Sequence, residues 1–171
     1  MHESIEKNLM DFIIDRVENT GIYDSEIFEL LSEVFVTGGF TSLETAKSIF
    51  EPSKVKSRGV LFVSKEINTN EMAGMVIVVP WTSSFSVKAK ENECEMHLLG
   101  VSKKFRGHGL GRRLVEEALN FSKGSDLKKM ILWTQKPMRE AQNLYESHGF
   151  TQCGEMARNG IDFLVYEREC T

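Results

Sequence analysis

The chain has 171 residues, of which 41% are hydrophobic, 27% are charged and only 3 are prolines, a composition typical of globular proteins and not of disordered or fibrous ones. Its length predicts one domain over residues 1–171, with enough chain to bury a core. The formal net charge of −4 gives no overall positive field, so we expect neither nucleic acid nor an anionic membrane as a partner.

The cysteines and the apolar runs predict a cytoplasmic protein without a membrane-spanning segment. Cys94, Cys153 and Cys170 form an odd set without a CxxC pair, which favours reduced thiols in the cytoplasm over disulfides or a zinc site. We therefore predict no bound metal. Residues 1–7 lack the basic start and apolar run of a signal peptide. The most apolar run, 75–81, is far shorter than the roughly 20 residues that span a bilayer, and it predicts a buried strand.

Apolar periodicity predicts the elements of the N-terminal half. In chain order, these are a strand over 12–17, a helix from 24 or 25 with Ile27, Leu30, Leu31, Val34 and Phe35 on one face, a short helix over 42–50, and strands over 59–67 and 72–80. The short helix should end before Pro52, because the residue before a proline disfavours the helical region. The two strands that follow it are joined by a polar turn and should form a hairpin.

The C-terminal half continues the alternation of strands and helices. It predicts a polar loop over 81–92, strands over 94–101 and 129–134, helices over 109–123 and 138–147, and final strands over 150–157 and 161–168 joined by an Asn-Gly turn. The order β-α-α-β-β-β-α-β-α-β-β predicts an α/β fold, α+β in some schemes, built on a single mixed, mostly antiparallel seven-stranded sheet with helices on both faces. Its exposed edge strands are natural surfaces for a homodimer.

One segment places Gly107, Gly109 and Gly111 between a predicted strand and an amphipathic helix. Glycines let successive backbone N–H groups turn toward one point, and at a helix N-terminus such groups form an anion site that suits a pyrophosphate. Arg106 and Arg112 add donors for phosphate. A glycine-rich turn can also be a plain connection, but the spacing excludes a Walker loop and a dinucleotide fingerprint.

Arg-x-x-Gly-x-Gly at Arg106, Gly109 and Gly111 resembles the coenzyme A signature of the GNAT superfamily of N-acetyltransferases. Two further blocks, 95–101 and 132–134 followed by 141–150, resemble that family's fourth strand, its fifth strand and the next helix. The resemblance covers about residues 93–151. It implies the acyl-CoA N-acyltransferase fold, acetyl-CoA as the acetyl donor, and a primary amine of a small molecule or a protein as the acceptor.

The same resemblance assigns the residues that would bind the cofactor. In the family, the fourth strand carries a bulge that splays it from the fifth, and the pantetheine arm lies between them. The backbone of Leu99 and Val101 would hold that arm, and Asn143 and Tyr145 would face the same cleft from the helix. The pyrophosphate would bind at the loop formed by Arg106, Gly107, His108, Gly109, Leu110, Gly111 and Arg112.

Direct attack of the amine through a tetrahedral intermediate needs a base for the ammonium and an acid for the departing thiolate. The resemblance places Tyr145 near the sulfur, and a phenol of pKa about 10 can protonate a thiolate of pKa about 8.5. Glu95 occupies a position where some members keep a catalytic glutamate and is the first candidate base. Strand alternation would put it on one side with His97 and Leu99. His97 and a water chain stay open as alternative bases.

Two other functions remain open from the sequence. The first is a noncatalytic acyl-CoA sensor or interaction module, which a buried salt bridge at Glu95 would favour. The second is a nucleotide-binding regulator that uses the glycine loop for ATP or NAD. The acceptor is not identified, although an acidic chain would attract a cationic amine at long range.

Overall fold

A computed structural model describes residues 11–171 of the chain. Its strands and main helices are β1 (Phe12–Arg16), α1 (Asp24–Leu31), α2 (Leu43–Ile49), α3 (Pro52–Ser57), β2 (Val60–Glu66), β3 (Met72–Pro80), β4 (Glu93–Val101), α4 (Leu110–Gly124), β5 (Lys129–Gln135), α5 (Arg139–Ser147), β6 (Thr151–Arg158) and β7 (Ile161–Glu169). A π-helical stretch, Ser32–Thr37, continues α1, and short 3₁₀ turns lie at Val17–Asn19 and Lys103–Phe105.

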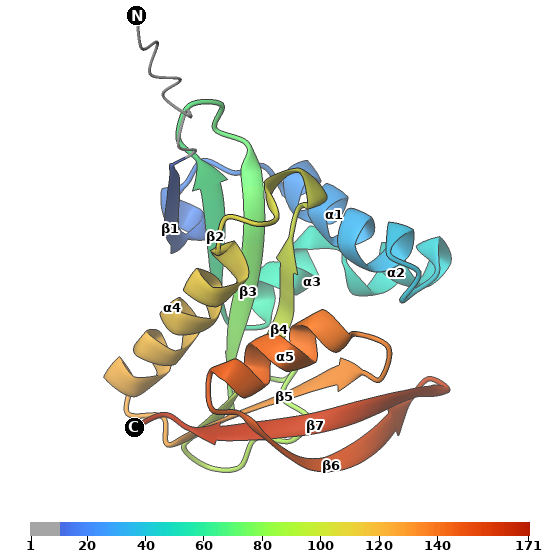
Figure 1. Cartoon of the computed structure of the whole chain (residues 1–171), viewed down its shortest axis with the longest axis vertical. Helices are drawn as coiled ribbons and strands as arrows, with labels where there is room; N and C mark the ends of the chain where they lie inside the picture. Colours follow the sequence, from blue (N-terminus) through green and yellow to red (C-terminus); the bar gives the residue numbers. More distant parts are fainter. Residues whose placement is uncertain (1–10) are drawn as a thin grey trace, which may run out of the picture.

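Within the described residues the strands form one seven-stranded sheet in the order β1-β2-β3-β4-β5-β7-β6 (Figure 1). Every neighbouring pair is antiparallel except β4 and β5, which are parallel. A parallel pair needs a crossover connection, and α4 supplies it. The predicted fold class, a single mixed and mostly antiparallel seven-stranded sheet, is confirmed.

Helices cover both faces of the sheet. Leu114, Val115 and Ala118 of α4 pack on one face, and Ile27 and Leu31 of α1 pack on the other. Each of these side chains is completely removed from solvent. Strand β3 lies between the two layers and is buried along nearly its whole length, which explains its almost unbroken apolar sequence.

Helix α3 is the main element that the sequence did not predict. We expected the chain to leave the helical region before Pro52, and α2 does end before it, with its C-cap at Phe50. Pro52 then starts a new helix at its first position, where the missing N–H has no helical partner to lose. Arg58 is the C-cap of α3, and its side chain enters the site described below.

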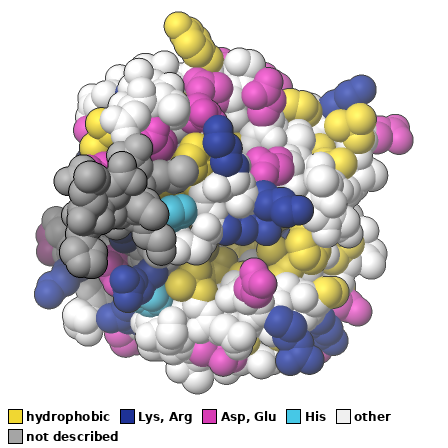
Figure 2. Space-filling model, turned by 45° about the horizontal axis from the view of Figure 1, so that its top comes forward, with side chains coloured by type: hydrophobic (Ala, Val, Ile, Leu, Met, Phe, Trp, Pro, Cys, Tyr) yellow, Lys and Arg dark blue, Asp and Glu magenta, His cyan; other side chains and the backbone are white. Residues whose placement is uncertain are grey.

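The expectations about surface charge and membrane segments can be compared with the structure. Basic and acidic side chains are interspersed over the face drawn in Figure 2, so this face does not carry a uniform negative charge. Among residues 11–171, no helix is both long enough and apolar enough to cross a membrane. The signal-peptide expectation concerns residues 1–7, which lie outside the described part, and the single-domain expectation stays a prediction.

Candidate active site

Strands β4 and β5 are paired only at their beginnings. Their parallel register joins Glu93 with Lys129 and continues to Glu95 with Ile131. Beyond that pair β4 continues along β3 and β5 continues along β7, so the two strands part. The edge of β4 that faces β5 therefore loses its strand partner from residue 96 onward, which leaves backbone groups free for a ligand.

A bulge in β4 lies just after this point. Ile77 of β3 faces His97, but Met75, two residues earlier, faces Gly100. Strand β4 therefore has one more residue than β3 over this stretch, and Leu98 has a φ of +52°. A bulge of this kind bends the strand and interrupts its ladder. The bulge implied by the family resemblance is confirmed.

The extra residue changes which face each side chain occupies. Leu98 packs with the α1 side of the sheet, whereas Leu99 packs with the α4 side. The expectation that Leu99 shares a face with Glu95 and His97 is wrong, because the bulge breaks the strict alternation of side chains along the strand.

The glycine loop presents a row of unpaired donors at the start of α4. Gly107 and Gly109 have φ values of +85° and +75°, and Gly109 is the N-cap residue. The first backbone hydrogen bond of the helix is donated by the N–H of Arg113 to Gly109 at 3.1 Å. Within residues 11–171, the backbone N–H groups from Gly107 to Arg112 donate to no other group. Such an arrangement suits an anion, and the helix dipole would add to the attraction.

The loop is held from behind by the first helical layer. The carboxylate of Glu33 accepts hydrogen bonds from the Ser102 hydroxyl at 3.1 Å and the Lys103 N–H at 2.8 Å. The Arg106 side chain folds back, and its Nε donates to the Val101 carbonyl at 3.2 Å. These contacts fix the loop in place before any ligand arrives.

The remaining basic side chains of the loop have local contacts. Arg112 lies 4.0 Å from Glu116, a weak exposed pair, and Arg113 donates to the Phe12 carbonyl at 3.3 Å. His108 is exposed and lies 5.6 Å from the Phe12 ring, centroid to centroid. Arg112 and His108 are thus available to an anion, whereas Arg113 is tied to β1.

Helix α5 separates the two residues that were expected to face one cleft. Tyr145 is buried, whereas Asn143 is exposed. Residues two apart on a helix lie about 200° apart around its axis, so they point to different sides. The buried partner of Tyr145 on this helix is Gln142, whose amide donates to the carbonyls of Gln135 and Lys136 at the end of β5.

Tyr145 packs between two aromatic rings. Its ring centroid lies 6.0 Å from that of Phe150 and 6.4 Å from that of Tyr166. Burial raises the pKa of Tyr145 above its ordinary value. The phenol therefore stays protonated at neutral pH and can act as a hydrogen donor, not as a base.

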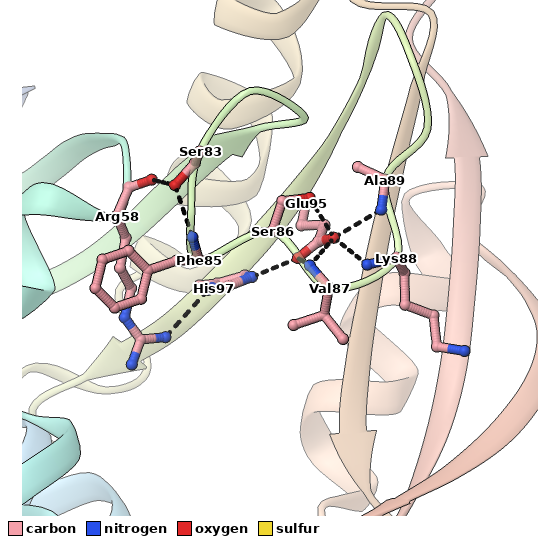
Figure 3. A network of polar contacts seen from close by, with 9 residues as sticks. All are labelled: Arg58, Ser83, Phe85, Ser86, Val87, Lys88, Ala89, Glu95 and His97. Atoms are coloured by element: carbon pink, nitrogen blue, oxygen red, sulfur yellow. Dashed lines mark hydrogen bonds and ion pairs between the residues drawn. The ribbon is translucent and has the colours of Figure 1, made fainter.

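Glu95 is fully buried beneath the loop between β3 and β4 (Figure 3). Its carboxylate accepts hydrogen bonds from the N–H groups of Val87 at 2.8 Å, Lys88 at 2.5 Å and Ala89 at 2.7 Å, and from the Ser86 hydroxyl at 3.0 Å. Burial by itself raises the pKa of this carboxyl, but hydrogen bonds from the side chain of His97 and from those N–H groups lower it to about 2.

His97 connects Glu95 to Arg58, which lies on the other side of the ring in Figure 3. Its Nδ1 is 3.0 Å from Nη1 of Arg58, and its Nε2 is 2.8 Å from Oε1 of Glu95. Because a guanidinium can only donate, Nδ1 of His97 accepts from Arg58. Nε2 therefore carries the proton and donates a hydrogen bond to Glu95. Burial lowers the pKa of His97, and the charge of Arg58 also lowers it. The ring is therefore neutral, and the contact with Glu95 is a hydrogen bond.

Aromatic and basic side chains surround His97 further. The ring centroids of His97 and Trp133 are 5.0 Å apart in an edge-on arrangement, and Arg158 lies 5.9 Å above the Trp133 ring. Arg58 lies 5.6 Å above the Phe85 ring. The sequence indicated neither arginine: Arg58 ends the unpredicted helix α3, and Arg158 immediately precedes a turn whose Asn-Gly signal says nothing about ligands.

The comparisons with known proteins agree with this geometry. The model of the Acetyltransferase (GNAT) family matches residues 24–150. The chain belongs to the GNAT acetyltransferase family. Its match to the N-alpha-acetyltransferase RimI of Mycobacterium tuberculosis is 37% identical over 81 residues, which are 45% of this chain and 49% of that protein. The matched segments span half or less of the curated relatives, from 23% to 50% of their lengths.

Solved structures show the same fold over nearly the whole chain. A GNAT acetyltransferase of Staphylococcus aureus superposes with a TM-score of 0.75 at 15% identity, covering 94% of this chain and 100% of that one. A Bacillus subtilis acetyltransferase solved in complex with CoA has a TM-score of 0.66 at 17% identity, covering 93% and 99% of the two chains. At such identities the likeness extends to the fold alone.

Proposed function

We propose that this GNAT protein is an acyl-CoA-dependent N-acetyltransferase that transfers the acetyl group of acetyl-CoA directly to a primary amine of a small molecule or a protein. The row of free N–H groups from Gly107 to Arg112, beside the point where β4 leaves β5, carries the proposal. The family match and the Bacillus subtilis neighbour that binds CoA support it. We place the activity in the cytoplasm, where the free thiols of Cys94, Cys153 and Cys170 stay reduced.

The residues present fit acetyl-CoA. The N–H groups of Gly107 to Arg112, with Arg106, His108 and Arg112 beside them, would bind the pyrophosphate. The edge of β4 at Leu99 and Val101, which has no strand partner on the β5 side, would hold the pantetheine arm, although the Val101 carbonyl already accepts from Nε of Arg106. The bound group supplies an activated thioester carbonyl near the divergence of the strands. Asn143 remains a proposed contact through its exposed position on α5.

Tyr145 is the proposed general acid. Its raised pKa keeps the proton on the phenol until a thiolate forms nearby. Glu95 was the first candidate base, but a carboxylate with a pKa of about 2 and donors on both oxygens is a weak proton acceptor at neutral pH. We propose instead that Glu95 positions the loop over 86–89 together with His97, and that water removes the proton of the amine.

The occupied carboxylate of Glu95 also favours the second candidate function, a noncatalytic acyl-CoA-binding module. That candidate predicts acetyl-CoA binding without transfer to any amine. Release of free CoA thiol, measured with a panel of amines, separates the two functions. Steady release above the rate of spontaneous hydrolysis would exclude the sensor.

Titration calorimetry with acetyl-CoA tests the cofactor site directly. Gly109→Glu should weaken binding at least about tenfold, because its carboxylate repels the pyrophosphate. Gly109→Ala is the matched control, because it imposes the same backbone strain at positive φ without the charge. Gly154→Glu adds the same charge at an open position on β6 and should bind normally. A parent protein that does not bind acetyl-CoA would refute the proposal.

A further inference from the structure

Arg58 is a partly buried cation with an incomplete set of partners. Its Nη1 donates to His97 at 3.0 Å and its Nη2 donates to the Ile49 carbonyl at 3.3 Å. Its Nε is buried and has no hydrogen-bond partner among residues 11–171. A buried donor without an acceptor is destabilising, so this atom is suited to an acceptor that a ligand brings.

Arg158 lies near the same place, since its charge acts on both Arg58 and His97. It ends β6, it is exposed, and its guanidinium lies over Trp133. Trp133 in turn meets His97, which is bound to Arg58. Each guanidinium group therefore contacts one member of the pair formed by His97 and Trp133. Neither arginine forms an ion pair with a carboxylate in the described part of the chain.

The cluster has an uncompensated positive charge. Burial lowers the pKa of Arg58, and the charge of Arg158 lowers it further, so the two cations disfavour each other. The carboxylate of this network, Glu95, lies beyond the His97 ring and is already bound by the loop over 86–89. Partly buried guanidinium groups are normally matched by carboxylate or phosphate oxygens, which they bind bidentately.

The proposed function puts the thioester near the point where β4 and β5 part, and the cluster lies beside that point. His97 and Trp133 are two residues past Glu95 and Ile131, the last pair that joins β4 to β5. Their side chains thus stand where the two strands begin to part. We propose that the acceptor is a primary amine that also carries an anionic carboxylate or phosphate group, held by Arg58 and Arg158. This inference rests on the proposed function, and it reverses the expectation of a cationic amine drawn from the net charge.

Binding can be measured without catalysis through the fluorescence of Trp133. The chain has 2 tryptophans, and Trp81→Phe leaves Trp133 as the single reporter. Titrations would use two matched pairs, phosphoethanolamine with ethanolamine and 4-aminobutyrate with butylamine. We expect at least one amine with an anionic group to bind about tenfold or more tightly than its partner without that group, because the anionic group gains charge-assisted hydrogen bonds. The pair with the larger ratio identifies phosphate or carboxylate as the preferred group.

Two variants locate the effect. Arg158→Gln should bring the ratio close to one, whereas Lys123→Gln, which removes an exposed charge in the last turn of α4, should leave it unchanged. A ratio near one in the parent, no binding by either anionic amine, or an unchanged ratio in Arg158→Gln would overturn the inference. Anionic amines that bind with the expected ratio but are never acetylated would refute the proposed function alone. Faster acetylation of the amines without an anionic group would refute the inference alone.

Discussion

At the scale of single residues, the role of Glu95 has the clearest test. If Glu95 holds the loop over 86–89, its substitution should lower stability, whereas if it is the general base, its substitution should lower kcat. Three backbone N–H groups and the Ser86 hydroxyl depend on its carboxylate. As an anchor, Glu95→Gln should lower the free energy of unfolding by about 2–4 kcal/mol, since several charge-assisted hydrogen bonds are weakened. Urea unfolding measures this change. A variant of unchanged stability whose kcat falls at all pH values would restore Glu95 as the base.

Substitution of Tyr145 should lower catalysis, whereas substitution of Glu95 should lower stability. Tyr145→Phe should lower kcat about 100-fold, the lower end of the range for general acids, and leave the Kd of acetyl-CoA within about twofold. Tyr166→Phe is the matched control, because it removes a hydroxyl from the same cluster, one that donates to Glu146 at 3.0 Å. Stopped-flow and steady-state release of thiol would measure both variants. Equal kcat values for Tyr145→Phe and the parent would assign Tyr145 to packing only.

At the scale of elements, the bulge in β4 depends on a leucine in the left-handed region. The φ of Leu98 is +52°, which costs a non-glycine residue about 1–2 kcal/mol. Leu98→Gly removes that cost, but it also removes a partly exposed apolar side chain. Leu98→Val keeps an apolar side chain, but a β-branched residue adopts a positive φ even less readily than leucine does. We expect the valine variant to be the less stable of the two by about 1 kcal/mol in urea unfolding. The reverse order would mean that side-chain packing outweighs backbone strain here.

At the scale of the whole molecule, the buried network of Glu95, His97 and Arg58 couples stability to pH. The pKa of His97 is lowered by folding, so its contribution is present above about 6.5 and is lost as the unfolded chain takes up a proton below that pH. The pKa of Glu95 is lowered to about 2, so its contribution is lost between about pH 4.3 and pH 2. Acidification should therefore reduce stability in two steps.

Urea midpoints between pH 7.5 and pH 5.5 isolate the first step. The parent should lose stability over this interval, and His97→Gln, which has no titratable ring, should lose less. Glu95→Gln should flatten the second step below pH 4.3. If the urea midpoint falls equally with pH in the parent and in His97→Gln, the pKa of His97 is not the cause of the first step.

The sequence by itself determined most elements and the position of the glycine loop. The apolar periodicity of helices and strands depends on residues only a few positions apart in the chain. Gly107 and Gly109 adopt a positive φ, which glycine tolerates in any surroundings. The tertiary structure alone decided the surroundings of Glu95, the different sides of α5 that Asn143 and Tyr145 occupy, and the meeting of Arg58 with His97. Arg58 and His97 are 39 residues apart, and sequence patterns report neighbours along the chain. Contacts across such a distance follow only from how the sheet brings its strands together.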